Sequence, residues 1–187
     1  MIQRIKQTKA LKPYQHQKIE DAGVAVDVDE KLSEQEYIGI KVDDYYMGLK
    51  LQGETPKAVD FIVAVDCGFN WYALYILEMK DTNSYTTRDI HEKFDTAINR
   101  FLQVDFKEIF LDDRYKYRLV KLYLVRPFKP AEKYSNYEEY KKIQEKIRTK
   151  DTLAIDQKLG DKIYRFRNLL LRIEREIPPN PLIVKVK

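Results

Sequence analysis

The sequence predicts an α/β domain of the α+β type, with a central mixed β-sheet flanked by helices. Three segments carry this prediction. Residues 57–81 form two arms rich in Val, Ile, Tyr, Phe and Trp around a Cys-Gly-Phe-Asn turn, which is typical of a β-hairpin. A helical spacing of apolar residues follows from residue 86, and residues 117–125, YRLVKLYLV, indicate a further strand. Because the hairpin arms are apolar on both faces, we expect them in the middle of a covered sheet.

Composition limits the class of protein before any motif is considered. A chain of 187 residues with 44% hydrophobic residues and six glycines is typical of one globular domain. One cysteine and two histidines exclude a disulfide framework and argue against a Cys/His zinc site. Nucleophile-elbow, Walker and dinucleotide glycine motifs are absent. Without a signal peptide or an apolar run of about 20 residues, we expect a cytoplasmic protein that does not enter a membrane.

The first third of the chain gives one helix signal. Residues 1–32 show no clear periodicity, whereas Ser33 and Glu36 form a capping-box pattern. Apolar residues follow at helical spacing, namely Ile38, Val42, Tyr45 and Leu49. We therefore predict a helix over residues 34–47, weakened by a glycine. Residues 47–52 are the candidate for a short strand before the hairpin.

The hairpin brings charged residues together at one end. If the turn centres on Phe69, paired residues have numbers that sum to 138, so Asp60 lies opposite Glu78. The strand period of two places Lys80 on the same face as Glu78. Two opposed carboxylates repel each other in a sheet, and a divalent cation would compensate for that repulsion.

The segments after the hairpin predict a helix, a strand and a further helix. Thr86 and Asp89 indicate a helix start, and Ile90, Phe94, Ala97 and Phe101 form its apolar stripe. The strand over residues 117–125 ends at Arg126 and Pro127. A helix is expected over residues 136–148, and apolar spacing over residues 162–177 favours another, with a strand as the alternative.

The arrangement of Asp60, Glu78-Met79-Lys80 and a following amphipathic helix resembles the PD-(D/E)XK nuclease superfamily, the fold of most type II restriction endonucleases. The resemblance implies a restriction-endonuclease-like three-layer core over about residues 33–126, within a single domain spanning residues 1–187. It implies a Mg²⁺-dependent endonuclease in which Asp60 and Glu78 bind the metal and Lys80 is the catalytic lysine. Asp66 is the rival first acid, but it lies at the turn end, far from Glu78.

In this family, an acid on the first helix often completes the metal site. The candidate here is Asp44 or Asp43, and a solvated helix carboxylate is the alternative. Arg126 is a candidate phosphate contact because the resemblance places its strand beside the catalytic one. An ion pair with a loop is the alternative for Arg126.

The excess of positive charge lies in the C-terminal part of the chain. Residues 130–187 hold 14 Lys and Arg against 9 Asp and Glu, whereas residues 1–129 are nearly balanced. Such a basic appendage attracts phosphate backbones, although a solvated lysine-rich surface has the same composition. Arg165 and Arg172 lie in a polar stripe suited to phosphate and base contacts, with a solvated helix face as the alternative.

Size bears on the expected partners, which are double-stranded DNA and a second protein subunit. A nuclease of 187 residues has room for a cleavage core but not for a large recognition domain. The favoured hypothesis is therefore the small cleavage subunit of a heterodimeric type IIS restriction enzyme, which cuts one strand while a larger subunit recognises the sequence. The alternatives are a self-sufficient homodimeric restriction or repair nuclease, and a non-catalytic module on the same fold that binds nucleic acid or protein.

Overall fold

The computed structural model describes residues 1–49, 53–81, 85–127 and 159–186. The strands are β1 (Gln15–His16), β2 (Glu20–Asp21), β3 (Val24–Ala25), β4 (Tyr37–Lys41), β5 (Phe61–Gly68), β6 (Trp71–Met79), β7 (Lys116–Val125), β8 (Tyr164–Phe166), β9 (Leu169–Leu171) and β10 (Ile173–Glu176). The helices are α1 (Ile2–Gln7), the 3-10 turn η1 (Lys12–Tyr14), α2 (Val42–Gly48), α3 (Thr87–Asp95), the π-helix η2 (Thr96–Asp105) and α4 (Lys107–Phe110).

The fold is α+β, organised on a six-stranded mixed sheet. Its strand order is β1-β4-β5-β6-β7-β10. The pairs from β1 to β6 are antiparallel, whereas β7 runs parallel to β6 and to β10. The sheet therefore changes from antiparallel to parallel at β6, whose two neighbours are β5 and β7.

The predicted hairpin is confirmed, including its register. Ile62 pairs with Ile76 and Ala64 with Leu74, as a turn centred on Phe69 requires. The two arms lie in the interior of the sheet, and most of their residues are buried. The predicted strand over residues 117–125 is also confirmed as β7, which lies beside β6.

The predicted helix after Thr86 is confirmed, and it extends to Asp105. Thr86 caps α3 by accepting a hydrogen bond from the Asp89 backbone amide, and η2 continues the helix directly. Its apolar stripe, formed by Ile90, Phe94, Ala97 and Phe101, is fully buried. This helix connects β6 to the parallel strand β7 and packs against the sheet between them.

The prediction of a helix over residues 34–47 was wrong in its first half. The Ser33 and Glu36 pair closes a turn, in which the Glu36 carboxylate accepts hydrogen bonds from the Ser33 amide and hydroxyl. The next residues form strand β4, and only α2 is helical. The strand candidate at residues 47–52 was wrong at its start, because Met47 lies in α2, and its residues 50–52 lie outside the described ranges.

The helix favoured over residues 162–177 was wrong, and the strand alternative was correct. β8 and β9 form a short hairpin around Arg167 and Asn168, and Arg167 has a positive φ of 51°. β10 then joins the edge of the main sheet next to β7. The helix expected over residues 136–148 lies outside the described residues.

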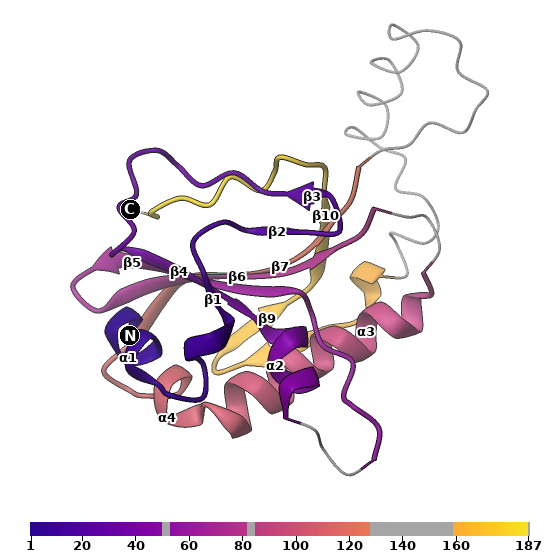
Figure 1. Cartoon of the computed structure of the whole chain (residues 1–187), viewed down its shortest axis with the longest axis horizontal. Coiled ribbons are helices and arrows are strands. Elements are labelled where there is room, and N and C mark those ends of the chain that lie inside the picture. The colour runs from indigo at the N-terminus through magenta and orange to yellow at the C-terminus, as the bar shows by residue number, and fades with distance from the viewer. Residues whose placement is uncertain (50–52, 82–84, 128–158, 187) are drawn as a thin grey trace, which may run out of the picture.

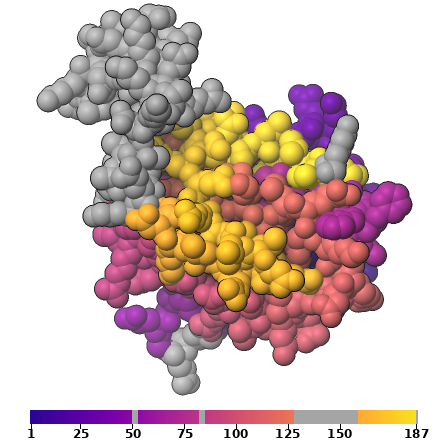
Figure 2. All heavy atoms as spheres, turned by 180° about the vertical axis from the view of Figure 1, so that it is seen from behind, coloured from indigo at the N-terminus to yellow at the C-terminus, as the bar shows by residue number. Residues whose placement is uncertain are grey.

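The two faces of the sheet are covered by different kinds of structure. All described α- and π-helices contribute their buried residues to one core, which also includes the even-numbered residues of β6. The other face is covered by the β2–β3 hairpin and by the chain around Ile183 (Figure 1). In the opposite view, residues 159–186 cover much of the visible surface in orange and yellow (Figure 2). Within the described residues, helices therefore flank only one face of the sheet.

Candidate active site

One end of the β5–β6 hairpin carries the predicted acids and lysine. Asp60 directly precedes β5, and Glu78 is the second-last residue of β6. Lys80 directly follows β6, and its backbone amide bonds the Val125 carbonyl at 2.9 Å. Since even-numbered residues of both arms face the helical core, all three side chains project toward the side covered by α3. The structure thus brings Asp60, Glu78 and Lys80 together.

Glu78 is a fully buried carboxylate held by two ammonium groups. Its Oε1 lies 2.8 Å from the Lys80 Nζ and 2.7 Å from the Lys93 Nζ, and its exposed fraction is 0%. Its Oε2 is buried without a hydrogen-bond partner in the part of the chain that the structure describes. Burial of an unsatisfied carboxylate oxygen is costly. The Oε2 atom of Glu78 can therefore bind a cation or accept a hydrogen bond.

Asp60 is buried beside Glu78 and has a strongly perturbed acidity. Its Oδ2 accepts a hydrogen bond of 2.5 Å from the Met79 backbone amide. Burial and the nearby Glu78 carboxylate raise the pKa of Asp60 to about 8, although the Lys93 ammonium and the Met79 amide oppose that change. A raised pKa caused by burial and a neighbouring like charge is typical of carboxylates at functional sites.

Of the two acids proposed on the preceding helix, Asp43 is the one coupled to Asp60. The Asp60 carbonyl accepts a hydrogen bond from the Val42 amide, which ties the start of α2 to this corner of the sheet. Asp43 contributes to the raised pKa of Asp60, and burial raises its own pKa to about 6. Asp44, in contrast, is partly exposed and lies 3.8 Å from the Lys41 ammonium. Asp43 is therefore the better placed of the two candidates.

Lys80 remains cationic despite partial burial. Burial is the largest single influence and disfavours its ammonium form, but the hydrogen bond to Glu78 and the negative charges of Glu78 and Asp60 together outweigh burial, so the pKa of Lys80 is raised. Its side chain is 26% exposed. The lysine is therefore a fixed positive charge at the edge of the carboxylate pair, within reach of solvent.

The three arginines predicted to bind nucleic acid occupy different environments. Arg126 directly follows β7 at the same end of the sheet as Lys80, but it is buried against Tyr85, whose hydroxyl accepts a hydrogen bond of 2.8 Å. Its amide bonds the Glu176 carbonyl. Arg165 in β8 and Arg172 before β10 are exposed. Neither of these two forms an ion pair with the carboxylates among the described residues.

Sequence reasoning missed Lys93 as a member of this cluster. It lies on α3, and its side chain is only 18% exposed. The available signal was its position three residues after Ile90 and next to Phe94, on the border of the buried stripe. A lysine at such a border packs its aliphatic stem against apolar residues and extends its ammonium group to a polar partner.

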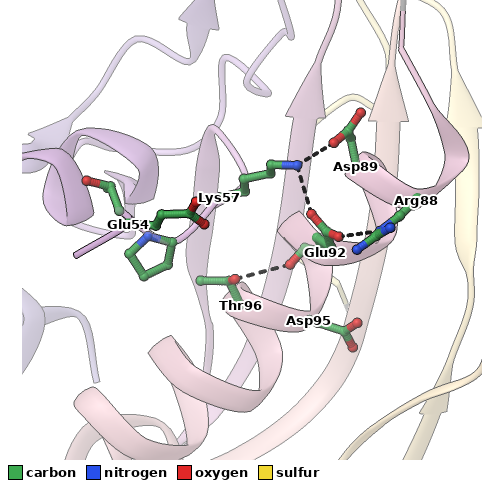
Figure 3. Close-up of a pocket in the computed structure, with 9 residues that line it drawn as sticks. Glu54, Lys57, Arg88, Asp89, Glu92, Asp95 and Thr96 are labelled. Carbon is green, nitrogen blue, oxygen red and sulfur yellow. Dashed lines mark hydrogen bonds and ion pairs between the residues drawn. The ribbon is translucent and has the colours of Figure 1, made fainter.

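A surface depression of about 700 Å³ lies beside this corner (Figure 3). The Lys57 ammonium points into it toward α3, 2.5 Å from Asp89 and 2.8 Å from Glu92, and Arg88 reaches the other side of Glu92. Its charged lining consists of Glu54, Lys57, Arg88, Asp89, Glu92 and Asp95. Because carboxylates outnumber cations there, the depression does not favour a phosphate.

The residues present fit a Mg²⁺ ion with few protein ligands. Among the described residues, no three His, Cys, Asp or Glu side chains are arranged to hold a metal together. Mg²⁺ retains several waters and commonly takes only one or two carboxylates. Asp60 and Glu78 supply two carboxylates. A bound cation would give the Oε2 atom of Glu78 a partner and would favour the ionised form of Asp60, whose pKa is raised.

No helix in the described ranges is both long and apolar enough to cross a membrane. Comparisons of the chain with protein-family models, with curated proteins and with solved structures found no match.

Proposed function

We propose that this chain is a Mg²⁺-dependent DNA endonuclease of the PD-(D/E)XK type. The observation that carries the proposal is the buried pair of Asp60 and Glu78 at one end of a central hairpin, with the Lys80 ammonium 2.8 Å from Glu78. Two adjacent carboxylates and a lysine are the groups that metal-assisted phosphodiester hydrolysis needs.

The topology supports the same proposal. β4, β5 and β6 form consecutive antiparallel pairs, the α3–η2 helix follows, and β7 returns parallel to β6. This order agrees with a restriction-endonuclease-like core of antiparallel strands, helix and strand. The third layer differs from expectation in the described residues, because a hairpin and the C-terminal segment take the place of helices there.

Each side chain has a defined role in the proposed chemistry. Asp60 and Glu78 would hold Mg²⁺, which when bound supplies positive charge beside a phosphodiester and acidifies water at the site. The Lys80 ammonium orients the attacking water and stabilises negative charge that develops on the phosphate oxygens. Lys93 is a positioning residue, because its hydrogen bond to Oε1 fixes the Glu78 carboxylate from the helix side.

The test is cleavage of supercoiled and linear DNA in the presence of Mg²⁺. We expect Glu78→Gln and Lys80→Gln to reduce cleavage by a factor of about 10² to 10³ or more, because each removes a charge that acts on the transition state. Asp66→Asn is the matched control for Glu78→Gln: it also removes one negative charge, at the far end of the hairpin, and keeps the hydrogen bond from the Gly68 amide. It should cleave as the wild type does.

Metal binding provides a readout besides activity. Calorimetric titration with Mn²⁺ should detect a site in the wild type and in Asp66→Asn, and no site in Glu78→Gln. Cleavage only with an added larger subunit would support the subunit hypothesis, whereas cleavage alone at a symmetric sequence would support a homodimer. A wild type that neither binds Mn²⁺ nor cuts DNA would contradict the proposal and leave a non-catalytic binding module.

A further inference from the structure

The turn of the β5–β6 hairpin, at the end opposite the carboxylates, has an unfavourable backbone conformation. Gly68, Phe69 and Asn70 all have positive φ, and the value for Phe69 is 52°. Bulky side chains rarely adopt this left-handed conformation, which costs about 1–2 kcal/mol. The Phe69 side chain is also 98% exposed, so folding gains nothing from its ring. Strain and exposure at one residue indicate a function other than stability.

The neighbouring residues add a second aromatic ring and two cations. The Lys116 Nζ lies 5.5 Å from the centroid of the Trp71 ring, and the Arg118 Cζ lies 4.8 Å from it. A bulge makes this possible, because Tyr72 pairs with Tyr117 but Ala73 pairs with Leu119, so Arg118 is the extra residue. Bulges re-aim side chains in this way.

These two cations have no carboxylate partner in the part of the chain that the structure describes. Among the described residues, neither Lys116 nor Arg118 forms an ion pair, and both are exposed. Nearby Arg114, in contrast, is paired with Asp112 at 2.6 Å. The hairpin's acid at this end, Asp66, accepts a hydrogen bond from the Gly68 amide within the turn. We call Phe69, Trp71, Lys116 and Arg118 the basic-aromatic tip.

We propose that the basic-aromatic tip binds single-stranded nucleic acid. An exposed ring on a fixed turn provides a platform for an unpaired base, and cations beside it neutralise the adjoining phosphates. The two uncompensated positive charges favour a polyanion over an apolar protein partner or a second copy of this chain. Figure 2 shows the turn projecting at the right edge of the molecule, beside the first residues of β7.

The tip is separate from the carboxylate site. Trp71 and Glu78 lie at opposite ends of β6, and because their numbers differ by an odd count they face opposite sides of the sheet. Seven residues of extended strand separate them by roughly 23 Å at about 3.3 Å per residue. Binding at the tip therefore does not depend on cleavage at Glu78, and it can be measured without a divalent metal.

Trp71 makes the test direct, because it is the only tryptophan in the chain. Titration with a 20-nucleotide oligothymidine in EDTA should change its fluorescence in a saturable manner. Anisotropy of the labelled oligonucleotide then compares variants. We expect Phe69→Ala to weaken binding about tenfold, because base stacking on an aromatic ring is worth about 1–3 kcal/mol. Lys116→Gln with Arg118→Gln should lower the slope of log affinity against log salt by about 1.4.

The matched control removes two charges elsewhere. Lys9→Gln with Lys12→Gln changes two exposed lysines outside both proposed sites and should alter affinity less than threefold. A larger loss in this control than in the tip variants would overturn the proposal, as would oligonucleotide binding that leaves Trp71 fluorescence unchanged. A wild-type dimer that Phe69→Ala converts to a monomer in sedimentation would also overturn it, in favour of a second copy. Oligonucleotide binding without any cleavage in Mg²⁺ would support the tip while the proposed function fails.

Discussion

At the scale of single residues, the two buried carboxylates are stabilised unequally. Glu78 receives two ammonium groups, whereas Asp60 receives one backbone amide and faces the Glu78 carboxylate. A buried carboxylate with few donors holds its proton to higher pH. We therefore expect the protonation state of Asp60 to make the stability of the protein depend on pH and on metal binding.

The raised pKa of Asp60 predicts how stability depends on pH. The folded protein binds this proton up to about pH 8, whereas the ordinary value for an aspartate is 3.8. The stability that the group contributes is thus complete below about pH 4 and is lost as pH rises toward 8. Asp60→Asn keeps an acceptor for the Met79 amide and cannot ionise. In EDTA, its free energy of unfolding should exceed that of the wild type by about 2 kcal/mol or more at pH 8.5.

Urea unfolding at pH 5 and pH 8.5 provides the measurement. The difference between Asp60→Asn and wild type should be smaller at pH 5, where Asp60 is protonated in the folded protein but is already ionised in the unfolded chain. Titratable groups that do not interact with Asp60 cancel in this comparison. A difference that is the same at both pH values would contradict the assignment of the raised pKa to Asp60.

The positions of Asp60, Glu78 and Lys80 could be predicted from the sequence, but that of Lys93 was not. A hairpin with a period of two and a turn at Phe69 fixes which residues face each other, so local geometry was sufficient. Lys93 reaches Glu78 only because α3 packs across the sheet, and the rotation of that helix is set by contacts far apart in the sequence. Nonlocal packing of this kind leaves only a weak trace in helical spacing.

At the scale of elements, strand β4 shows why a helix was predicted wrongly. A capping-box pattern and helical apolar spacing both pointed to helix over residues 34–47. However, β5 has an edge that needs a hydrogen-bonding partner, and Tyr37 to Lys41 pair with it along five residues. Pairing in a buried sheet outweighs intrinsic propensities that differ by less than about 1 kcal/mol per residue. The segment over residues 162–177 was mispredicted for the same reason, because β10 pairs with β7.

The β5–β6 turn provides a test of strain in an element. Since Phe69 has a positive φ and is almost fully exposed, Phe69→Asn should raise the free energy of unfolding by about 0.5–1 kcal/mol. Phe69→Val removes the same ring but keeps an unfavourable β-branched side chain at this φ, so it should lower stability. Urea unfolding compares the three proteins. Equal stabilities for the Asn and Val variants would show that the turn is not strained at this residue.

At the scale of the whole molecule, the sheet depends on a cover made of segments distant in sequence. One face is covered by helices, and the other by the β2–β3 hairpin and the C-terminal residues. The amide of Ile183 bonds the Asp27 carbonyl, and the Tyr75 hydroxyl contacts the Val184 backbone. The C-terminal segment is thereby attached both to the N-terminal hairpin and to β6, on the face opposite the carboxylates.

This cover should contribute measurably to stability through Ile183. Its side chain is fully buried in the second core, so Ile183→Ala removes apolar contacts and leaves a cavity. We expect the free energy of unfolding to fall by about 2–5 kcal/mol. The neighbouring Leu182 is 47% exposed, and Leu182→Ala should change stability by about 0.5 kcal/mol or less. Urea unfolding of both variants decides the point, and equal effects would mean that the C-terminal segment does not cover the sheet as a specific layer.

Because Ile183 and Glu78 lie on opposite faces, Mn²⁺ binding by the folded Ile183→Ala protein should remain that of the wild type.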